Sequence, residues 1–434
     1  MTRRSLRILV AILLFASVAE FVIRGPVRLV RGAGWNDFLS PYIQAKAWAH
    51  GKNPYSAQSV VSFWPPDNSR PPWVDTEAAN GTLEMKRGIP TPYPITSLVL
   101  LSPFTLLPWS IALPLWGVIC VAAAVITPFV LLSVTGCDLG EQRALLFLAA
   151  ALALAPLHTG LGTGNPAILA VSLTVSTVGA VCSGRWKTAA ILLVIAVCLK
   201  PTVAAGLLLY YLVRRQWRIG GFACALSAII GVLGVCRLAL VGVPWLSSYV
   251  ENTRKIFAPG SLADFARTDA IRFNMINAQV LFYSLFRNAS LANRLSLLLG
   301  VCLLGCWLWF CYRRRAPSEV LEISTISVLC LLVVYHRFYD AALLIWPLAW
   351  SLLVVRKRST AIVTLLAIVP FLVPGATLLS ERASQIPPAI ANGWCWNAIV
   401  IPHEIWDLIF LAGLLLYFMS GEFEGPGSDR ASLR

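Results

Sequence analysis

Residues 111–134 read IALPLWGVICVAAAVITPFVLLSV and contain no charged side chain. An apolar run of this length matches the roughly 20 residues that an α-helix needs to cross a bilayer. Similar runs lie near residues 6–23, 144–158, 165–182, 219–241, 291–312, 319–335, 341–355, 360–379 and 399–420. Together they predict an all-α polytopic integral membrane protein.

The composition supports this fold class. Of the 434 residues, 58% are hydrophobic and only 13% are charged, about half of the roughly 25% charge typical of a soluble domain. The net charge of +15 arises from short basic clusters between the apolar runs, such as Arg356-Lys357-Arg358. This is the positive-inside pattern of membrane proteins, so the charge indicates topology. We therefore expect membrane lipids as partners and no nucleic acid.

Segment 188–213 has basic clusters on both sides, and Lys200-Pro201 lies near its middle. Proline interrupts helices, so we expect a helical hairpin that returns both clusters to the cytoplasm. With this hairpin the chain has about twelve spans (range 10–13), and both termini are cytoplasmic. The basic loops 184–187, 214–218, 313–318 and 356–359 then share the cytoplasmic side. Residues 1–420 would form a single membrane domain, followed by a short cytoplasmic tail, 421–434.

Three longer polar segments then fall outside: the first extracytoplasmic loop 24–93, a second large loop 242–290, and 380–398. The first loop is expected to carry a short interfacial helix, with Ser40 as its N-cap and Gly51 as its stop. The start of the chain also resembles a signal peptide that would be cleaved after Ala19. We prefer an uncleaved first helix, because the rest of the chain is equally hydrophobic.

Asp37 is the first candidate for a chemical role. It lies just beyond the first apolar run, in the sequence Trp35-Asn36-Asp37-Phe38. A carboxylate at that interface could act as a general base. It could equally cap a helix or pair with a nearby cation, Arg31 or Lys46.

Lys200 and the turn at residues 336–340 are the other candidates. A lysine deep in a span costs roughly 2.5–3.5 kcal/mol on insertion scales, so its presence needs an explanation. It could bind a lipid phosphate, or it could reach the interface without any ligand. His336, Arg337 and Asp340 could bind phosphate or sugar hydroxyls, or form an ordinary polar turn. No two histidines have the spacing of helical metal ligands, so we expect no metal site and no cofactor, although a divalent ion is not excluded.

Several motifs resemble glycosyltransferase family 87, whose members are polyprenyl-phosphate-sugar-dependent enzymes of the GT-C class. The family's first outer loop corresponds to Asp37-Phe38, Tyr42, Ala45, Ala47 and Gly51-Lys52-Asn53-Pro54-Tyr55. Further matches are Tyr93-Pro94, Gly164-Asn165-Pro166 and Leu199-Lys200-Pro201, although Ile95 replaces the second proline of the family's Tyr-Pro-Pro segment. The motifs occur in order over residues 30–220, and beyond residue 240 only the hydropathy is similar.

The resemblance implies a GT-C-like fold and transfer of a hexose, typically mannose, from a polyprenyl-phosphate donor. The acceptor would be a lipid or glycolipid, reached on the extracytoplasmic face of the plasma (inner) membrane in a bacterial cell envelope. Asp37 would be the catalytic base, and Lys200, His336 and Arg337 would bind the donor phosphate. We expect the sugar or the acceptor to contact Tyr42, Gln44, Tyr55, Tyr93, Asn165 and Asp340.

Phosphate leaves without protonation, so inverting transfer needs one base and several cations but no second carboxylic acid. Two other functions stay open: a transporter or flippase of lipid-linked sugars, and a polymerase or ligase of cell-surface glycans. A transporter is expected to show an internal repeat with paired broken helices. The sequence shows one broken hairpin and no repeat, which favours the enzyme.

Overall fold

The computed structural model describes residues 3–32, 35–267, 270–313 and 318–421. Within these ranges all regular structure is helical, apart from isolated β-bridge positions, among them the pair Met275 and Arg337. The predicted all-α fold is therefore confirmed for the described chain. Residues 422–434 of the expected tail and residues 314–317 of the expected basic loop lie outside these ranges.

The first half of the chain combines a long N-terminal helix with a group of short ones. The helices are α1 (Arg3–Val22), η1 (Ile23–Val27), α2 (Arg28–Arg31), α3 (Leu39–Ala49), α4 (Ala57–Ser62), α5 (Pro72–Ala79), α6 (Leu83–Arg87), α7 (Ile95–Leu101) and η2 (Ser102–Leu106). Longer helices follow: α8 (Trp109–Thr135), α9 (Gln142–Ala153), α10 (Ala155–Thr163), α11 (Ala167–Cys182), α12 (Trp186–Leu199) and α13 (Pro201–Val213).

The second half begins with α14 (Gly220–Leu240), α15 (Trp245–Ile256), η3 (Ala270–Asn274), α16 (Ala278–Phe286), α17 (Ala289–Arg313) and α18 (Glu319–Val333). A continuous helical stretch follows, formed by η4 (Phe338–Leu344), α19 (Ile345–Ala349) and η5 (Trp350–Val354). The chain continues through α20 (Arg358–Ile368), η6 (Val369–Leu372), α21 (Gly375–Glu381), η7 (Ala383–Gln385), α22 (Pro388–Ala391), η8 (Trp396–Val400) and α23 (His403–Met419).

Four helical stretches of the described chain are long and apolar enough to cross a membrane: Arg7–Arg31, Trp109–Thr135, Gly220–Leu240 and Ala289–Arg313. The number is six if each of two bent helix pairs counts as one span. Several other apolar runs are helical but have only 10–17 residues, fewer than a single crossing usually needs. The count of twelve spans stays a prediction.

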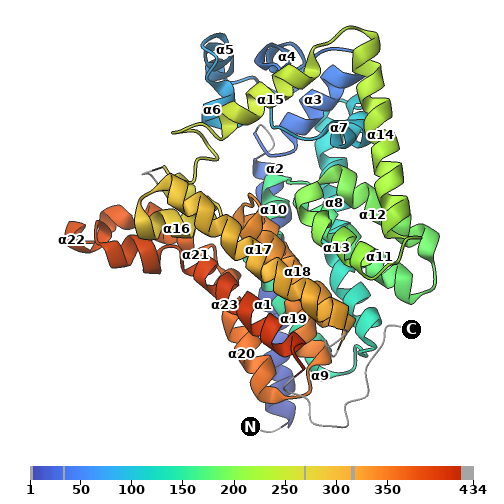
Figure 1. Cartoon of the computed structure of the whole chain (residues 1–434), viewed down its shortest axis with the longest axis vertical. Coiled ribbons are helices and arrows are strands. Elements are labelled where there is room, and N and C mark those ends of the chain that lie inside the picture. The colour runs from blue at the N-terminus through green and yellow to red at the C-terminus, as the bar shows by residue number, and fades with distance from the viewer. Residues whose placement is uncertain (1–2, 33–34, 268–269, 314–317, 422–434) are drawn as a thin grey trace.

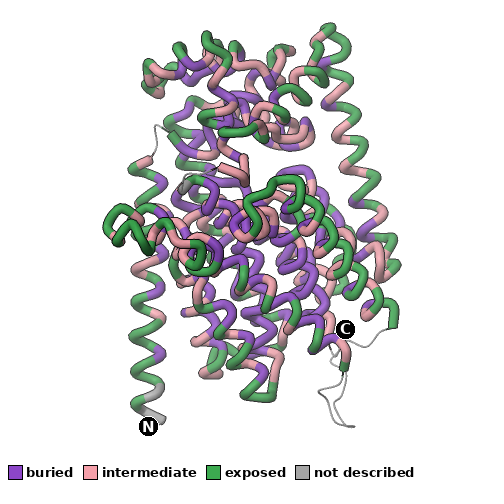
Figure 2. Tube along the Cα trace, turned by 60° about the vertical axis from the view of Figure 1, so that its left-hand side comes forward, coloured by how far each residue is buried: buried purple, intermediate pink, exposed green. Residues whose placement is uncertain are grey.

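The long helices α1, α14 and α17 expose large apolar side chains. Phe15 on α1 is 77% exposed, Leu233 on α14 is 64% exposed and Leu297 on α17 is 67% exposed. Figure 2 shows the N-terminal helix at the edge of the molecule, with exposed positions along much of its length, while buried positions gather further inside. Such apolar surface favours contact with lipid over contact with water.

The short helices of the first outer segment gather at one end of the molecule. In Figure 1, α3 to α7 and α15 lie together at the top, and the N-terminus lies at the bottom. α3 packs against α7, η2 and α4, and most of its residues are buried. The predicted short helix is therefore present, but it lies inside this group.

The start of α3 differs slightly from the sequence-based expectation. Its N-cap is Phe38 and not Ser40, because the Ser40 hydroxyl donates to Gln44 Oε1 at 3.2 Å and accepts from the Thr91 backbone N–H at 3.1 Å. Beyond its end, Gly51 has φ +65°, which glycine adopts without strain. The Arg237 guanidinium donates to the carbonyl oxygens of Trp48 and Ala49. A cation at a helix C-terminus is stabilising, so Arg237 stabilises the C-terminal end of α3.

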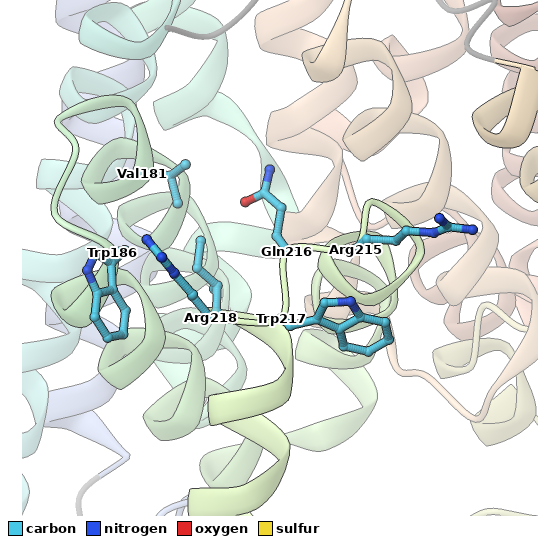
Figure 3. A pocket seen from close by; sticks show the side chains of 7 residues that line it. Val181, Trp186, Arg215, Gln216, Trp217 and Arg218 are labelled. Atoms are coloured by element: carbon cyan, nitrogen blue, oxygen red, sulfur yellow. The ribbon is translucent and has the colours of Figure 1, made fainter.

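The expected break at Lys200-Pro201 is present. α12 ends at Leu199 and α13 begins at Pro201, where the missing N–H of proline costs nothing in the first turn. Trp186, at the start of α12, and Arg218, just beyond the end of α13, line the same pocket of about 520 Å³. The two ends of the segment therefore lie close together, so the chain reverses direction between them. In Figure 3 the Arg218 side chain extends toward Trp186 across this pocket.

The proposed orientation can be tested with single cysteines introduced into a variant in which all eleven native cysteines are replaced by serine or alanine. Gln385→Cys lies in the predicted outer segment 380–398, and Trp217→Cys lies in the predicted cytoplasmic loop. We expect a membrane-impermeant maleimide to label Gln385→Cys in intact cells, and Trp217→Cys only after permeabilisation. The reverse pattern, or equal labelling of both, would contradict the topology.

Candidate functional site

Asp37 is fixed by the turn that follows α10. Gly164 ends this helix with φ +70°, a conformation that glycine tolerates, and Asn165 follows it directly. The Asp37 backbone N–H donates to the Thr163 carbonyl at 2.7 Å. The Asn165 side-chain amide donates to Asp37 Oδ2 at 2.9 Å. The carboxylate of Asp37 is thus held from two directions and stays half-buried.

Asn165 connects Asp37 to Lys200. The Lys200 ammonium donates to Asn165 Oδ1 at 3.1 Å and forms an ion pair with Asp340 Oδ1 at 2.6 Å. Only 12% of the Lys200 side chain and 4% of the Asp340 side chain are exposed. The lysine that looked isolated in the sequence therefore has a buried carboxylate partner. This pairing explains how the described chain compensates a cation at the tip of the hairpin.

His336 and Arg337 lie on the other side of Asp340. His336 Nδ1 is 3.0 Å from Asp340 Oδ2, and the Arg337 backbone N–H donates to the same oxygen at 3.1 Å. The His336 side chain is fully buried. The Arg337 side chain is half-buried, and its Nε donates to the Tyr335 hydroxyl at 2.8 Å. We refer to Asp37, Asn165, Lys200, His336, Arg337 and Asp340 as the Asp37 cluster.

Tyrosines surround this cluster. Lys200 Nζ lies 4.7 Å from the centre of the Tyr339 ring, a cation–π distance. Burial raises the pKa of the Tyr93 hydroxyl, and the nearby carboxylates of Asp37 and Asp340 raise it further. Tyr93 therefore stays neutral and can donate or accept a hydrogen bond at the cluster.

The cluster contains two carboxylates, Asp37 and Asp340, and two cations, Lys200 and Arg337, so its formal charges balance. Burial disfavours the charged form of Arg337, but the Tyr335 and Tyr339 hydroxyl groups and the Asp37 carboxylate act in the opposite direction and raise its pKa overall. Arg337 therefore remains charged. Among the described residues no carboxylate forms an ion pair with it, whereas Lys200 is already paired with Asp340. Arg337 is thus the cation of the cluster that is best placed to accept an added anion.

Three of the predicted contact residues make structural hydrogen bonds outside this cluster. Each side chain donates a hydrogen bond to a backbone carbonyl oxygen. The Tyr42 hydroxyl donates to Leu107 at 2.8 Å, the Gln44 amide to Thr91 at 2.7 Å and the Tyr55 hydroxyl to Tyr93 at 2.8 Å. All three side chains are buried. They attach the segment that carries Tyr93 and η2 to α3 and its surroundings, so they support the cluster indirectly.

Tyr335, Tyr339 and the Thr163 carbonyl were not predicted. The two tyrosines flank His336-Arg337 in the sequence, so aromatic residues around a polar turn were the available signal. Nothing in the sequence pointed to Thr163, because a backbone contact across 126 residues leaves no residue pattern. Among the described residues, no group of three or more His, Cys, Asp or Glu side chains is arranged to hold a metal ion.

Neither structural alternative for Asp37 is found. α3 has no side-chain cap, and within the described chain no ion pair joins Asp37 to Arg31 or Lys46. Its carboxylate instead belongs to a network in which Asn165 is the shared partner of Asp37 and Lys200. Such networks can fix a base in one orientation.

A helical membrane protein with a half-buried carboxylate and two cations at one site fits the class of membrane-embedded transferases. Comparison with models of known protein families matches residues 91–334 to glycosyltransferase family 87. This range is more than half of the 434 residues, so the chain belongs to glycosyltransferase family 87. No curated protein and no solved structure matches the chain.

The matched range confirms the family that the sequence motifs indicated. It contains Tyr93, Asn165 and Lys200, and it continues well beyond residue 220, where the quoted motifs end. Asp37 precedes it, and His336 follows its end by two residues. The site roles of these residues therefore rest on their geometry.

Proposed function

We propose that this glycosyltransferase moves a hexose, in particular mannose, from a polyprenyl-phosphate donor to a lipid or glycolipid acceptor on the extracytoplasmic face. The observation that supports this most directly is the position of Asp37. A half-buried carboxylate, oriented by Asn165, lies in one network with Lys200 and within the electrostatic reach of Arg337. One base beside cations is the set of groups that displacement of a phosphate requires.

In this reaction an acceptor hydroxyl oxygen attacks the anomeric carbon of the donor sugar. A bond forms between that oxygen and the anomeric carbon, and the bond from the carbon to the phosphate oxygen breaks with its electron pair. Asp37 takes the proton of the hydroxyl, and polyprenyl phosphate leaves as an anion. A single displacement inverts the anomeric configuration.

The cations would stabilise the leaving phosphate, and they differ in whether a carboxylate already pairs with them. Arg337 has no carboxylate partner among the described residues and presents a planar guanidinium, which suits phosphate oxygens. Lys200 could contribute while it remains paired with Asp340. His336 is fully buried against Asp340, so we assign it a positioning role behind the two cations.

The direct test is sugar transfer in membranes with and without this protein. With radiolabelled polyprenyl-phosphate mannose, we expect a labelled lipid product that separates from the donor by chromatography only when the protein is present. An equal amount of that product in both membranes would contradict the proposed activity. Release of the sugar to water alone, without a labelled lipid, would contradict the proposed acceptor.

A further inference from the structure

A second pocket, with a volume of about 390 Å³, lies between η3 and the polar segment 380–398. Its lining contains no residue of the Asp37 cluster and no charged side chain. Two aromatic rings and four neutral polar side chains contribute to it: Phe273, Trp396, Ser380, Ser384, Asn392 and Asn397. Its volume is within the usual range for small-ligand sites, roughly 300–1,000 Å³.

The lining matches a neutral polyhydroxylated ligand. Serine hydroxyls and asparagine amides both donate and accept hydrogen bonds, as sugar hydroxyls do. Aromatic rings add apolar area against the C–H faces of a sugar ring. A phosphate would find no cation in this lining. The Trp396 indole N–H is buried without an acceptor among the described residues, and a hydroxyl seated against its edge would supply one.

The pocket is close to the Asp37 cluster. Phe273 is two residues before Met275, and Met275 forms a β-bridge with Arg337. Phe273 and Met275 are separated by two Cα–Cα steps of about 3.8 Å each. A bridge spans about 5.5 Å between Cα atoms, so the Cα atoms of Phe273 and Arg337 lie within about 13 Å of each other. Thr377 Oγ1 also donates to Asn274 Oδ1 at 2.8 Å, which joins α21 to η3 beside the pocket.

We propose that this pocket binds the neutral glycan headgroup of the acceptor. The proposal rests on the proposed function and names its acceptor class: a glycolipid whose sugars occupy the pocket while a hydroxyl reaches Asp37. A lipid alcohol without sugars would leave the pocket empty and would be a poor acceptor. Ser384 and Asn392 are exposed at the rim, so a headgroup can enter from solvent.

The test uses two rim variants of the full-length protein in nanodiscs. Ser384→Trp fills the pocket, and Asn392→Ala removes one amide. Both positions are exposed, so neither change should disturb folding. Gln385→Ala is the matched control, because it changes an exposed neighbour that does not line the pocket. The acceptor probes are octyl α-mannoside, its α-linked disaccharide and octanol, with polyprenyl-phosphate mannose as donor.

We expect Ser384→Trp to raise the KM for the disaccharide probe by about tenfold or more, and Asn392→Ala by a smaller factor, since one or two hydrogen bonds correspond to this range. The KM for the donor should not change, and Gln385→Ala should match the wild type. Saturation-transfer NMR should also detect the disaccharide on the wild-type protein and lose the signal with Ser384→Trp.

Unchanged acceptor KM values in both rim variants would overturn the pocket assignment, as would the absence of a saturation-transfer signal on the wild type. Equal transfer to octanol and to the sugar probes would also overturn it, while the proposed transferase activity would stand. Conversely, if the NMR signal depends on Ser384 but no probe receives sugar, the pocket is supported and the proposed function fails.

Discussion

Asp37→Asn should reduce sugar transfer by a factor of about 10² to 10⁴, the usual contribution of a general base. The asparagine keeps an oxygen that can accept the hydrogen bond now made from Asn165 Nδ2 to Asp37 Oδ2. It also keeps the backbone contact to Thr163. The shape of the site should survive, and the loss should fall on kcat because only the proton acceptor is removed. The measurement is transfer from polyprenyl-phosphate mannose at saturating donor.

Asp75→Asn provides the matched control for this variant. Asp75 lies in the same predicted outer loop, but its carboxylate pairs with Arg70 at 3.1 Å and is about half exposed. The same chemical change there should leave the rate within about twofold of the wild type, because exposed ion pairs contribute little. Donor binding and protein level should be normal in both variants. Near-normal turnover in Asp37→Asn would remove Asp37 as the base.

The fold class could be predicted from the sequence because hydropathy acts locally. The run at 111–134 became part of α8, and Lys200-Pro201 became the break between α12 and α13. The number of crossings was harder to predict, because several apolar helices are shorter than one span and their placement depends on tertiary packing. The start of α3 was displaced for a similar reason. Ser40 is used by Gln44 and by the distant Thr91, and this contact cannot be read from local capping rules.

The candidate site could be predicted only in part, because its contacts join distant segments. The sequence pointed to three separate polar positions: Asp37 in the first outer loop, Lys200 inside an apolar segment and Asp340 in a polar turn. The structure brings them into one network. Nothing in the sequence indicated that Asn165 would connect Asp37 with Lys200 or that Asp340 would neutralise the lysine. Buried polar groups need partners, so Lys200 did imply a partner, but the sequence alone did not show which residue this was.

The Lys200–Asp340 ion pair gives the second large expected effect. Lys200→Met should lower the free energy of unfolding by about 3–5 kcal/mol, because it leaves the buried Asp340 carboxylate without its cation. The double variant Lys200→Met/Asp340→Asn removes that unpaired charge, so it should recover most of the stability. Thermal unfolding of the four proteins of this cycle, purified in one detergent, measures the coupling.

Donor affinity separates the role of Lys200 in stability from a role at the phosphate. If the ammonium contacts the leaving phosphate, the double variant should be stable and still bind the donor weakly. Arg214→Met is the matched control, because Arg214 pairs with the fully buried Glu322 beyond the far end of α13. That variant should lose stability but keep normal donor affinity. If the double variant instead recovered both stability and donor affinity, Lys200 would act only through Asp340, and the stabilisation of the phosphate would fall to Arg337.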